Sequence, residues 1–392
     1  LGISFLEKIC NTTVILCSAT QPCFENVKHP IRTDVKEMIS YDEKIWSIFK
    51  RTKIEYAGEY SIEELSEFIK KTICSVNSLL IVCNTKKEAA ILFDLLNGGD
   101  YKLFHLSAAM CMEHRRLVLA ELYDSLECKN DYKTVCVSTQ VIEAGVDISF
   151  EAVIRMTAGM DSVVQSAGRC NRNGELEGNA PVYIVRIKDE SLTYLTEINL
   201  AKQATEELLC RYKRNAEIYQ SDLTSDEAIK YYYKKFFEIQ SSRDVNYHDH
   251  PVKNMPSLFS LLSWNDDWVE KNEMNFLFRQ AFATAGRRFQ VFDSDSIDVI
   301  VPFGEGEEII TELLSERAEY DIGYVKDLLE KAKGYTVSIF KYQKEKLERN
   351  QALIPLRGGT ILGIEKNYYS NQTGLAEANG KEREKECNTL IW

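Results

Sequence analysis

Short, predominantly apolar runs alternate with amphipathic stretches over residues 53–186. The runs lie at residues 79–83, 103–106, 135–137 and 152–156, and such runs are typical of strands buried on both faces of a sheet. The stretches between them repeat apolar residues every three or four positions, as in a helix that packs one face against a core. Strands that alternate with helices predict an α/β domain with a parallel sheet covered on both faces.

Two helices of this domain carry start signals in the sequence. Ser61-Ile-Glu-Glu64 and Thr85-Lys-Lys-Glu88 each place a hydroxyl residue three positions before a glutamate, which is the pattern of a capping box. Gly98 follows the second amphipathic stretch, where a glycine ends a helix. We therefore expect helices that begin at residues 62 and 86.

The rest of the chain has a different pattern. Residues 13–17 (TVILC) predict a short buried strand, followed by Ser18-Ala19-Thr20. Residues 192–219 and 225–240 predict two helices, and a polar segment with prolines at 248–256 predicts a boundary. Beyond it, two helical stretches (308–316 and 321–331) and a strand (335–340) predict a smaller α+β domain.

The composition describes a folded, acidic protein. Of 392 residues, 44% are hydrophobic and 28% charged, and the formal net charge is −12. This charge argues against indiscriminate binding to polyanions but leaves room for a locally basic groove. The eleven cysteines form no Cys-x-x-Cys pair, so we interpret them as reduced thiols of a cytoplasmic protein. No apolar run approaches the ~18 residues of a membrane span. His248-Asp249-His250 is interpreted as a solvated loop, and no metal site is predicted.

The stretch from residue 135 to residue 172 carries the candidate chemistry. A polar loop ends in Gly145 and Asp147, and a later segment contains Gln165, Gly168-Arg169 and Arg172. We expect this later segment to be helical, so that Gln165, Arg169 and Arg172 share a face and converge on one target. Arginine suits a phosphate target because its planar fork stays charged and pairs with phosphate oxygens. An isolated Gly-x-Asp is better explained as a turn, but the residues that follow favour a functional role.

Three hydroxyl residues follow predicted strands. Thr85 lies at a strand–helix junction, where free N–H groups favour a phosphate; a plain N-cap explains it equally well. Ser107 follows the next strand, and a structural role is the better explanation for it and for the neighbouring His105. Thr139 could donate a hydrogen bond to a nucleic-acid phosphate.

Two motifs of nucleotide-driven motors are absent from these 392 residues. There is no Gly-x-x-x-x-Gly-Lys-Ser/Thr loop to cradle phosphates, and no Asp-Glu-x-His or Asp-Glu-Ala-Asp box to hold Mg²⁺. We therefore expect that the chain by itself neither binds ATP tightly nor hydrolyses it.

Several stretches together resemble one family. The segment VCVSTQVIEAGVDIS and the segment QSAGRCNRNG resemble motifs V and VI of superfamily-two helicases, and SAT at 18–20 resembles motif III. With TVILCSATQP, LLIVCNTKKEA, LFHLSAAMCMEHRR, SLFSLLSWN and AGRRFQVFD, the chain resembles the C-terminal part of the CRISPR-associated helicase-nucleases of type I systems. The nuclease domain and most of the first motor lobe are missing from it, so we expect the chain to start partway through a larger protein.

The resemblance implies a fold and an order of parts. It implies the end of a first RecA-like lobe at 1–50 and a second RecA-like helicase lobe at 51–190. A helical linker at 191–255 and a C-terminal accessory domain at 256–392 follow. It also implies ATP-driven unwinding and degradation of DNA, with ATP and Mg²⁺ held mainly by the missing lobe and nuclease metal ions in the missing nuclease domain. The implied partners are single-stranded DNA, a guide-RNA surveillance complex (Cascade) and the N-terminal half of the same protein.

By matching positions, the resemblance also implies residue roles. Arg169 and Arg172 would be arginine fingers and Gln165 a γ-phosphate contact. Nucleotide contacts would come from the motif residues Gly145, Asp147 and Gly168. DNA-backbone contacts would come from Thr85, Ser107 and Thr139. Ser166 departs from the family pattern, which usually has arginine there, and this puts one basic contact in doubt.

Two other hypotheses remain open at this point. The chain could be a free-standing, non-catalytic module that docks on DNA or protein. It could also belong to another superfamily-two helicase that acts in repair or on RNA. A preference for RNA over DNA would count against the leading hypothesis.

Overall fold

The computed structural model describes most of the chain in two compact units. The first unit comprises residues 1–236 and 296–392, and the second comprises residues 237–295. The described residues are 2–18, 20, 36, 38, 49–127, 132–193, 195–242, 258–265, 269–270, 279–289 and 296–376.

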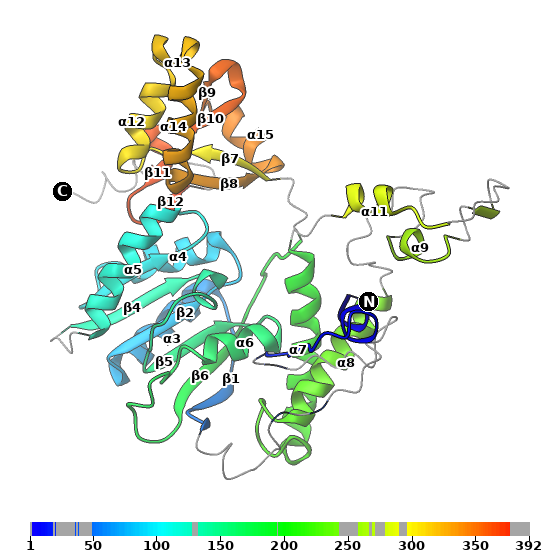
Figure 1. Ribbon diagram of the computed structural model, residues 1–392. Coiled ribbons are helices and arrows are strands. Elements are labelled where there is room, and N and C mark those ends of the chain that lie inside the picture. Colours follow the sequence, from blue (N-terminus) through cyan, green and yellow to red (C-terminus); the bar gives the residue numbers. More distant parts are fainter. Residues whose placement is uncertain are drawn as a thin grey trace. The chain divides into compact units, whose positions relative to one another are not determined.

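A six-stranded parallel sheet forms the centre of the first unit (Figure 1). Its strands run in the spatial order β1 (Thr52–Tyr60), β6 (Ala180–Ile187), β5 (Ala152–Met156), β2 (Ser78–Val82), β4 (Lys133–Ser138) and β3 (Tyr101–Leu106). Three of the four apolar runs form the inner strands β5, β2 and β4, which are almost wholly buried, whereas the run at 103–106 forms the partly buried edge strand β3. This sheet confirms the predicted α/β fold class.

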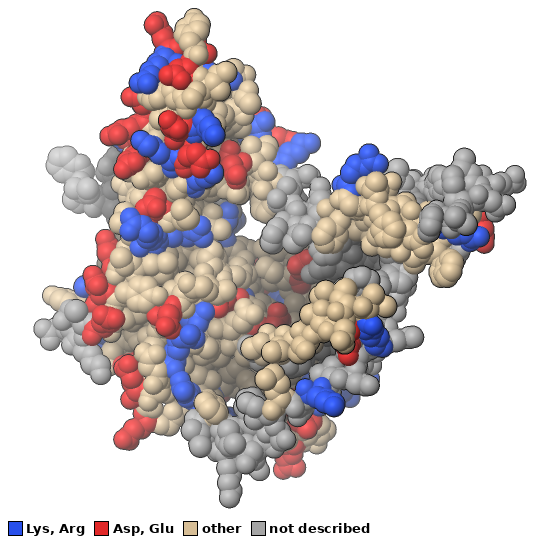
Figure 2. Space-filling view, in the orientation of Figure 1, with Lys and Arg blue, Asp and Glu red and all other residues tan. Residues whose placement is uncertain are grey.

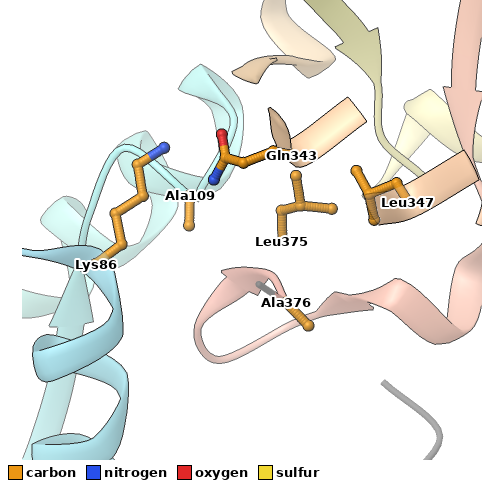
Figure 3. Close-up of a pocket in the computed structure, with 6 residues that line it drawn as sticks. All are labelled: Lys86, Ala109, Gln343, Leu347, Leu375 and Ala376. Atoms are coloured by element: carbon orange, nitrogen blue, oxygen red, sulfur yellow. The ribbon is translucent and has the colours of Figure 1, made fainter. Parts of the chain in front are cut away.

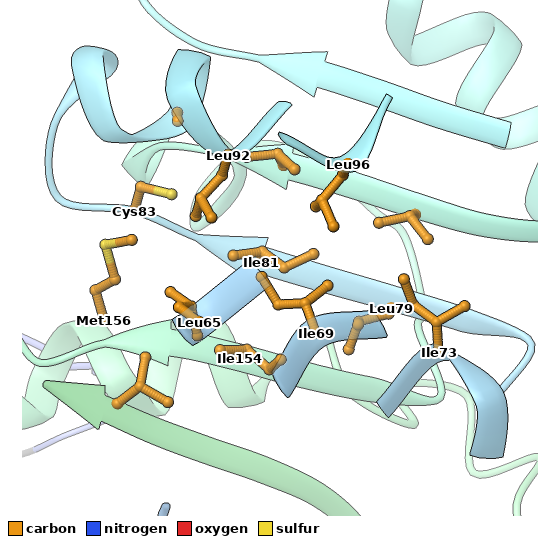
Figure 4. Close-up of a cluster of buried hydrophobic side chains, with 14 of the residues drawn as sticks. Leu65, Ile69, Ile73, Leu79, Ile81, Cys83, Leu92, Leu96, Ile154 and Met156 are labelled. Carbon is orange, nitrogen blue, oxygen red and sulfur yellow. The ribbon is translucent and has the colours of Figure 1, made fainter. Parts of the chain in front are cut away.

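Helices α3 (Ile62–Ser75) and α4 (Lys86–Leu96) cover one face of the sheet (Figure 4). Both begin with the predicted capping box, at Ser61 and Thr85. Gly98, with φ +83°, follows the end of α4 in a conformation that favours glycine. The helices pack on alternate residues of the strands, for example Ile154 and Met156 of β5, because successive side chains of a strand point to opposite faces.

Helices α5 (Met112–Glu127) and α6 (Met160–Ala167) contact the other face of the sheet. Ser125 of α5 shares a hydrogen bond of 2.8 Å with Thr134 of β4. Arg155 of β5 donates to Ser162 of α6 over 2.8 Å. Residues that alternate with the apolar core positions thus meet polar partners on this side.

Two helices follow the lobe, as the sequence predicts. They are α7 (Thr196–Arg214) and α8 (Asp226–Ser242). The buried Tyr232 of α8 donates a hydrogen bond of 2.6 Å to Asp161 of α6. The predicted linker is therefore attached to the helix that precedes residues 168–172, the Gly-Arg segment.

The strand predicted at residues 13–17 is wrong. The chain there is irregular after the short helix α1 (Gly2–Lys8), and Ile15 is 67% exposed. A β-rich run forms a strand only beside a neighbour that pairs with it, and the six-stranded sheet does not include this segment.

The C-terminal residues of the first unit form a smaller α+β subdomain, as predicted. Its mixed sheet has the order β8 (Thr336–Phe340), β7 (Ser296–Ile300), β10 (Ile361–Ile364) and β9 (Leu353–Leu356). Helices α12 (Glu305–Leu313) and α14 (Ile322–Ala332) pack against it through an apolar cluster. The other elements are α13 (Glu316–Tyr320), α15 (Lys341–Arg349) and the short pair β11 (Tyr369–Ser370) and β12 (Gly374–Leu375). On the face shown in Figure 2, acidic and basic side chains are interspersed over this subdomain.

The second unit is described only in part. Helices α9 (Leu258–Leu262) and α11 (Phe282–Arg288) are joined by a backbone hydrogen bond of 2.8 Å from Ala281 to Leu261. The boundary predicted at 248–256 lies outside the described residues. The exact limits of the four predicted parts stay a prediction.

A buried polar contact joins the C-terminal subdomain to the parallel-sheet lobe. Tyr369 Oη accepts from Cys111 N over 3.1 Å and lies 2.9 Å from His114 Nδ1. His114 Nε2 lies 2.9 Å from the Asn371 carbonyl oxygen, so Nε2 carries the proton and Nδ1 accepts from Tyr369. His114 also stacks on Phe303 with ring centroids 4.2 Å apart. Burial lowers the pKa of His114, which is consistent with a neutral ring.

We expect Tyr369→Phe to lower the free energy of unfolding of the 392-residue chain by about 1–3 kcal/mol, because two buried polar groups lose their partner. Urea denaturation measures this change. Tyr320→Phe, on a side chain that is 83% exposed, is the control. Equal stability of the two variants would show that the contact does not hold the subdomain in place.

Candidate nucleotide and nucleic-acid site

The Gly-Arg segment lies in a turn that follows helix α6. The helix ends at Ala167 with Gly168 as its C-cap, so the prediction that Gln165, Arg169 and Arg172 share one helix face is wrong. Phe150 N donates to Arg169 O and Asn171 N donates to Phe150 O, each over 2.8 Å. This bridge to the preceding loop draws the backbone out of the helix after Ala167. Gln165 alone lies on the helix, where it is exposed.

Arg169 is buried and is held by backbone carbonyl groups. Its Nε donates to Ile142 O over 2.9 Å and its Nη2 donates to Glu143 O over 2.7 Å. Burial, and next the positive charge of Arg172, lower the pKa of Arg169. Arg172 Nη1 donates to the carbonyl oxygen of Gly168 over 3.4 Å, so its guanidinium group lies beside the residue that precedes Arg169.

Arg172 is exposed and forms an ion pair with Asp147. Its side chain is 41% exposed and that of Asp147 is 79% exposed. Gly145, with φ +75°, makes the turn that leads to Asp147, and a residue with a Cβ is strained there. The backbone oxygen of Arg172 also accepts from Arg51. The structure thus brings together Asp147, Arg169 and Arg172, three of the predicted site residues.

Neither guanidinium group is locked in a buried pair with a carboxylate. Arg169 contacts neutral carbonyl oxygens, and Arg172 pairs with a carboxylate that water reaches. Exposed ion pairs contribute about 0–1 kcal/mol, so a phosphate with more than one charge can displace Asp147. The arrangement can present the positive charge of Arg172 to an anion at the surface of the lobe, while Arg169 is buried in the same turn.

The three hydroxyl residues lie together at the carboxyl edge of the sheet. Val82, Ser138 and Leu106 lie in register across β2, β4 and β3, and Thr85, Thr139 and Ser107 follow them. Thr85 is partly exposed and caps α4 through a bond from Glu88 N of 3.1 Å. Thr139 is only 4% exposed. Their contacts to nucleic acid stay a prediction.

Ser107 is fully buried. Its Oγ accepts from Ala109 N over 3.2 Å and lies 3.1 Å from His105 Nε2. These bonds fit the structural role that the sequence also allowed. A phosphate would reach this hydroxyl only after the loop that begins at Ser107 rearranged.

A small groove lies beside this edge, between the lobe and the C-terminal subdomain (Figure 3). Lys86 at the start of α4 and Gln343 of α15 extend toward each other from its two sides. The remaining wall is apolar and comes from Ala109, Leu347, Leu375 and Ala376.

The sequence reasoning missed a buried polar network under the Gly-Arg turn. Arg155 is fully buried, and its Nε lies 3.1 Å from Glu143 Oε1. The same carboxylate oxygen accepts from Ser162 and Ser166, over 2.7 and 3.0 Å. Ser166, the departure from the family pattern, therefore joins α6 to the loop. The available signal was the charge of Arg155 within the apolar run AVIRM, since arginine is almost never fully buried without a partner.

Glu88 of the second capping box has an unusual pKa. Burial, and next the charge of Glu190, raise the pKa of Glu88 to about 7. Its Oε2 accepts from Thr85 N over 3.0 Å. Because the pKa is raised on folding, Glu88 favours the folded state below its unfolded pKa, and this contribution is lost as the pH rises through about 7.

We expect Glu88→Gln to raise the free energy of unfolding by about 2 kcal/mol at pH 8 and to leave it unchanged near pH 5. Glutamine keeps the capping-box acceptor and removes the charge beside Glu190. Urea denaturation at both pH values measures the difference. Glu64→Gln at the exposed capping box of α3, whose carboxylate pairs with Lys188, is the matched control and should not stabilise. A gain for Glu88→Gln that is equal at both pH values would contradict the charge argument.

The described residues contain neither a metal-binding cluster nor a membrane-spanning helix. Within the described part of the chain, no cluster of three or more His, Cys, Asp or Glu side chains is arranged to hold a metal ion. His248 and His250 lie outside the described residues. None of the described helices has the length and apolar character needed to cross a membrane.

Known proteins resemble the region that contains this site. The family model of the C-terminal region of the CRISPR-associated nuclease/helicase Cas3 matches residues 75–175. Cas3 of Haloferax volcanii is 46% identical over 88 residues, which are 22% of this chain and 9% of that protein. Cas3 of Methanothermobacter thermautotrophicus is 26% identical over 138 residues, which are 35% of this chain and 16% of that protein.

Solved structures resemble the fold over a longer stretch. T. fusca Cas3-ADP superposes with a TM-score of 0.52 at 14% identity, over 83% of this chain and 42% of that one. T. fusca Cas3-ATP gives a TM-score of 0.51 at 14% identity, over 80% and 39%. At this identity the likeness concerns the fold. The chain spans less than half the length of each of these relatives.

The six-stranded parallel sheet and the helices that cover it define a RecA-like lobe of α/β class. More narrowly, residues 75–175 match the family model of the C-terminal region of Cas3 nuclease/helicases.

Proposed function

We propose that this chain is the half of an ATP-driven, single-strand DNA helicase-nuclease that supplies arginine fingers and DNA-backbone contacts. The observation that carries the proposal is the exposed Arg172, which contacts both Asp147 and the carbonyl group of Gly168 in the turn that also contains the buried Arg169. The matched Cas3 region includes all three residues.

The two arginines would have different tasks. Arg172 can leave Asp147 and pair with a phosphate oxygen, since its present partner is exposed and weakly bound. Arg169 is fixed by two carbonyl groups, so it presents its charge without reorganising, which is what electrostatic catalysis requires. The exposed amide of Gln165 would contact the terminal phosphate, and the turns at Gly145 and Gly168 would let the backbone approach the nucleotide.

ATP, when held by a second lobe that carries the phosphate loop and the Mg²⁺ ligands, supplies the phosphoanhydride bond that is cleaved. The residues present here fit one side of such a nucleotide, because Arg172 and Asp147 are exposed and the buried Arg169 adds a second cation in the same turn. Closure of the lobes would bring the arginines to the phosphate and would couple hydrolysis to movement along DNA.

Besides ATP, the lobe would bind a single strand of DNA. Thr85, Thr139 and Ser107 follow β2, β4 and β3 at the carboxyl edge of the sheet, where Thr85 would contact the DNA backbone directly and the buried Thr139 and Ser107 would do so after their loops rearrange. A CRISPR RNA-guided surveillance complex would deliver the DNA and a nuclease domain would cut it, as the nuclease/helicase name of the Cas3 relatives suggests.

The test is ATP hydrolysis by the protein that joins these residues to an ATP-binding lobe. We expect hydrolysis to be stimulated by single-stranded DNA and to be stimulated much less by RNA of the same sequence. Strong selectivity for RNA would reject the DNA function. A rate of ATP hydrolysis that neither DNA nor RNA changes would reject the helicase assignment.

A further inference from the structure

Arg155 is the centre of a buried network that no motif of the proposed function requires. It comes from β5, on the face opposite to the α3–α4 core, and its side chain has no exposed surface. Burying a guanidinium group is costly unless it is paired and hydrogen-bonded. Loss of any hydrogen-bond partner of Arg155 would leave part of a buried charged group unsatisfied. We therefore expect each of these contacts to be strongly favoured.

One arm of the network reaches the Gly-Arg turn. Arg155 Nε lies 3.1 Å from Glu143 Oε1, and its Nη2 donates to Ser162 Oγ over 2.8 Å. Ser162 Oγ in turn donates to Glu143 over 2.7 Å. The backbone oxygen of Glu143 accepts from Arg169 Nη2 over 2.7 Å. Arg155 thus fixes the residue whose backbone holds Arg169.

The other arm reaches the edge that carries the predicted DNA contacts. Arg155 Nη1 donates to Asn84 Oδ1 over 2.7 Å. Asn84 Nδ2 donates to Thr157 O over 2.9 Å and to Glu190 Oε1 over 2.7 Å. Asn84 is 3% exposed and directly precedes Thr85, the N-cap of α4. Arg155 therefore contacts the loop that presents Thr85.

We propose that Arg155 is a positioning residue that couples the strand-binding edge at Asn84–Thr85 to Arg169 through Glu143. The inference rests on the proposed function, because it concerns the stimulation of ATP hydrolysis by single-stranded DNA. A small movement of the Thr85 loop on a DNA backbone is passed by hydrogen bonds to Glu143 and to the carbonyl group that orients Arg169. Misplacement of a catalytic group by about 1 Å can cost two orders of magnitude in rate, so such a path can control turnover.

The test uses the protein that includes the ATP-binding lobe. We expect Arg155→Met to reduce the ratio of DNA-stimulated to basal ATP turnover about tenfold, while the KM for ATP and the Kd for single-stranded DNA stay unchanged. Arg155→Lys keeps the charge but not the fork and should restore only part of the ratio. A merely structural role would lower basal and stimulated turnover by the same factor.

Ser162→Ala tests the same path in a protein that keeps the Arg155–Glu143 ion pair and therefore its fold. We expect it to lower the stimulation ratio about threefold. Ser66→Ala is the matched control, since Ser66 is a buried serine of α3 that donates only to Glu63 O. An unchanged ratio in both Arg155→Met and Ser162→Ala would overturn the inference and leave the proposed function standing. A wild-type protein without DNA stimulation would overturn both.

Discussion

Arg172→Ala is expected to lower DNA-stimulated ATP turnover about a thousandfold in the protein that joins this chain to an ATP-binding lobe. Binding of single-stranded DNA should not change, because Arg172 is not one of the predicted DNA contacts and forms its ion pair with Asp147. The folded lobe should also keep its stability, since the side chain is 41% exposed and its partner Asp147 is 79% exposed. Loss of turnover without loss of folding or binding is the signature of a group that acts on the transferring phosphate.

Two variants sharpen this experiment. Arg186→Ala removes an arginine of similar exposure whose Nε lies 3.2 Å from Glu206 in an ion pair, and it should leave turnover unchanged. Arg172→Lys keeps one positive charge without the planar fork and should recover only a small part of the rate. Single-turnover hydrolysis with saturating ATP and DNA separates the chemical step from binding. Wild-type turnover in Arg172→Ala would refute the finger assignment for this residue.

The lobe could be predicted from the sequence because each of its signals is local. The capping boxes at Ser61 and Thr85 need only residues three positions apart, and the structure has both. Apolar runs long enough for one strand each predicted the inner strands, since a strand buried on two faces needs no polar alternation. Parallel strands have their carboxyl ends at the same edge of the sheet. This explains why Thr85, Thr139 and Ser107, which follow three of the strands, lie at one edge.

Other features could not be predicted because distant contacts decide them. The run TVILC has the composition of a strand but has no neighbour to pair with in the six-stranded sheet. Helix α6 was expected to continue through Arg172, yet the bridge between Phe150 and Cys170 ends it at Ala167. The hydrogen bond between Arg169 and Glu143 joins residues that are 26 positions apart in the sequence, and no local sequence pattern predicts it.

The roles of the predicted site residues stay a prediction, and their predicted arrangement on one helix face is wrong. Sequence spacing placed Arg169 and Arg172 on one helix face, whereas both lie in a turn, where Arg172 pairs with Asp147 and Arg169 donates to backbone carbonyl groups. The residues that hold Arg169 come from the loop after β4, and they are held in turn by Arg155 of β5. A distant backbone carbonyl group that accepts a hydrogen bond leaves no signal in the identity of its own residue, so the sequence does not show these bonds.

The second large effect is expected for Arg169→Ala, which should differ from Arg172→Ala in one respect. Removal of Arg169 leaves the buried carbonyl groups of Ile142 and Glu143 without a donor. We expect the free energy of unfolding of the 392-residue chain to fall by about 2–3 kcal/mol, as measured by urea denaturation. In the protein with both lobes, DNA-stimulated turnover should fall at least about a thousandfold as well.

Arg169→Lys distinguishes two roles of Arg169. The residue could act on the phosphate as an arginine finger, or it could only hold the loop that contains Ile142 and Glu143 in place. Lysine can donate to one or both of the same carbonyl groups, so it should recover part of the lost stability. A finger requires the guanidinium fork at a fixed place, and Arg169→Lys should therefore remain close to Arg169→Ala in turnover. If Arg169→Lys recovers turnover in proportion to stability, Arg169 only clamps the loop, and the positive charge that acts on the phosphate is that of Arg172 alone.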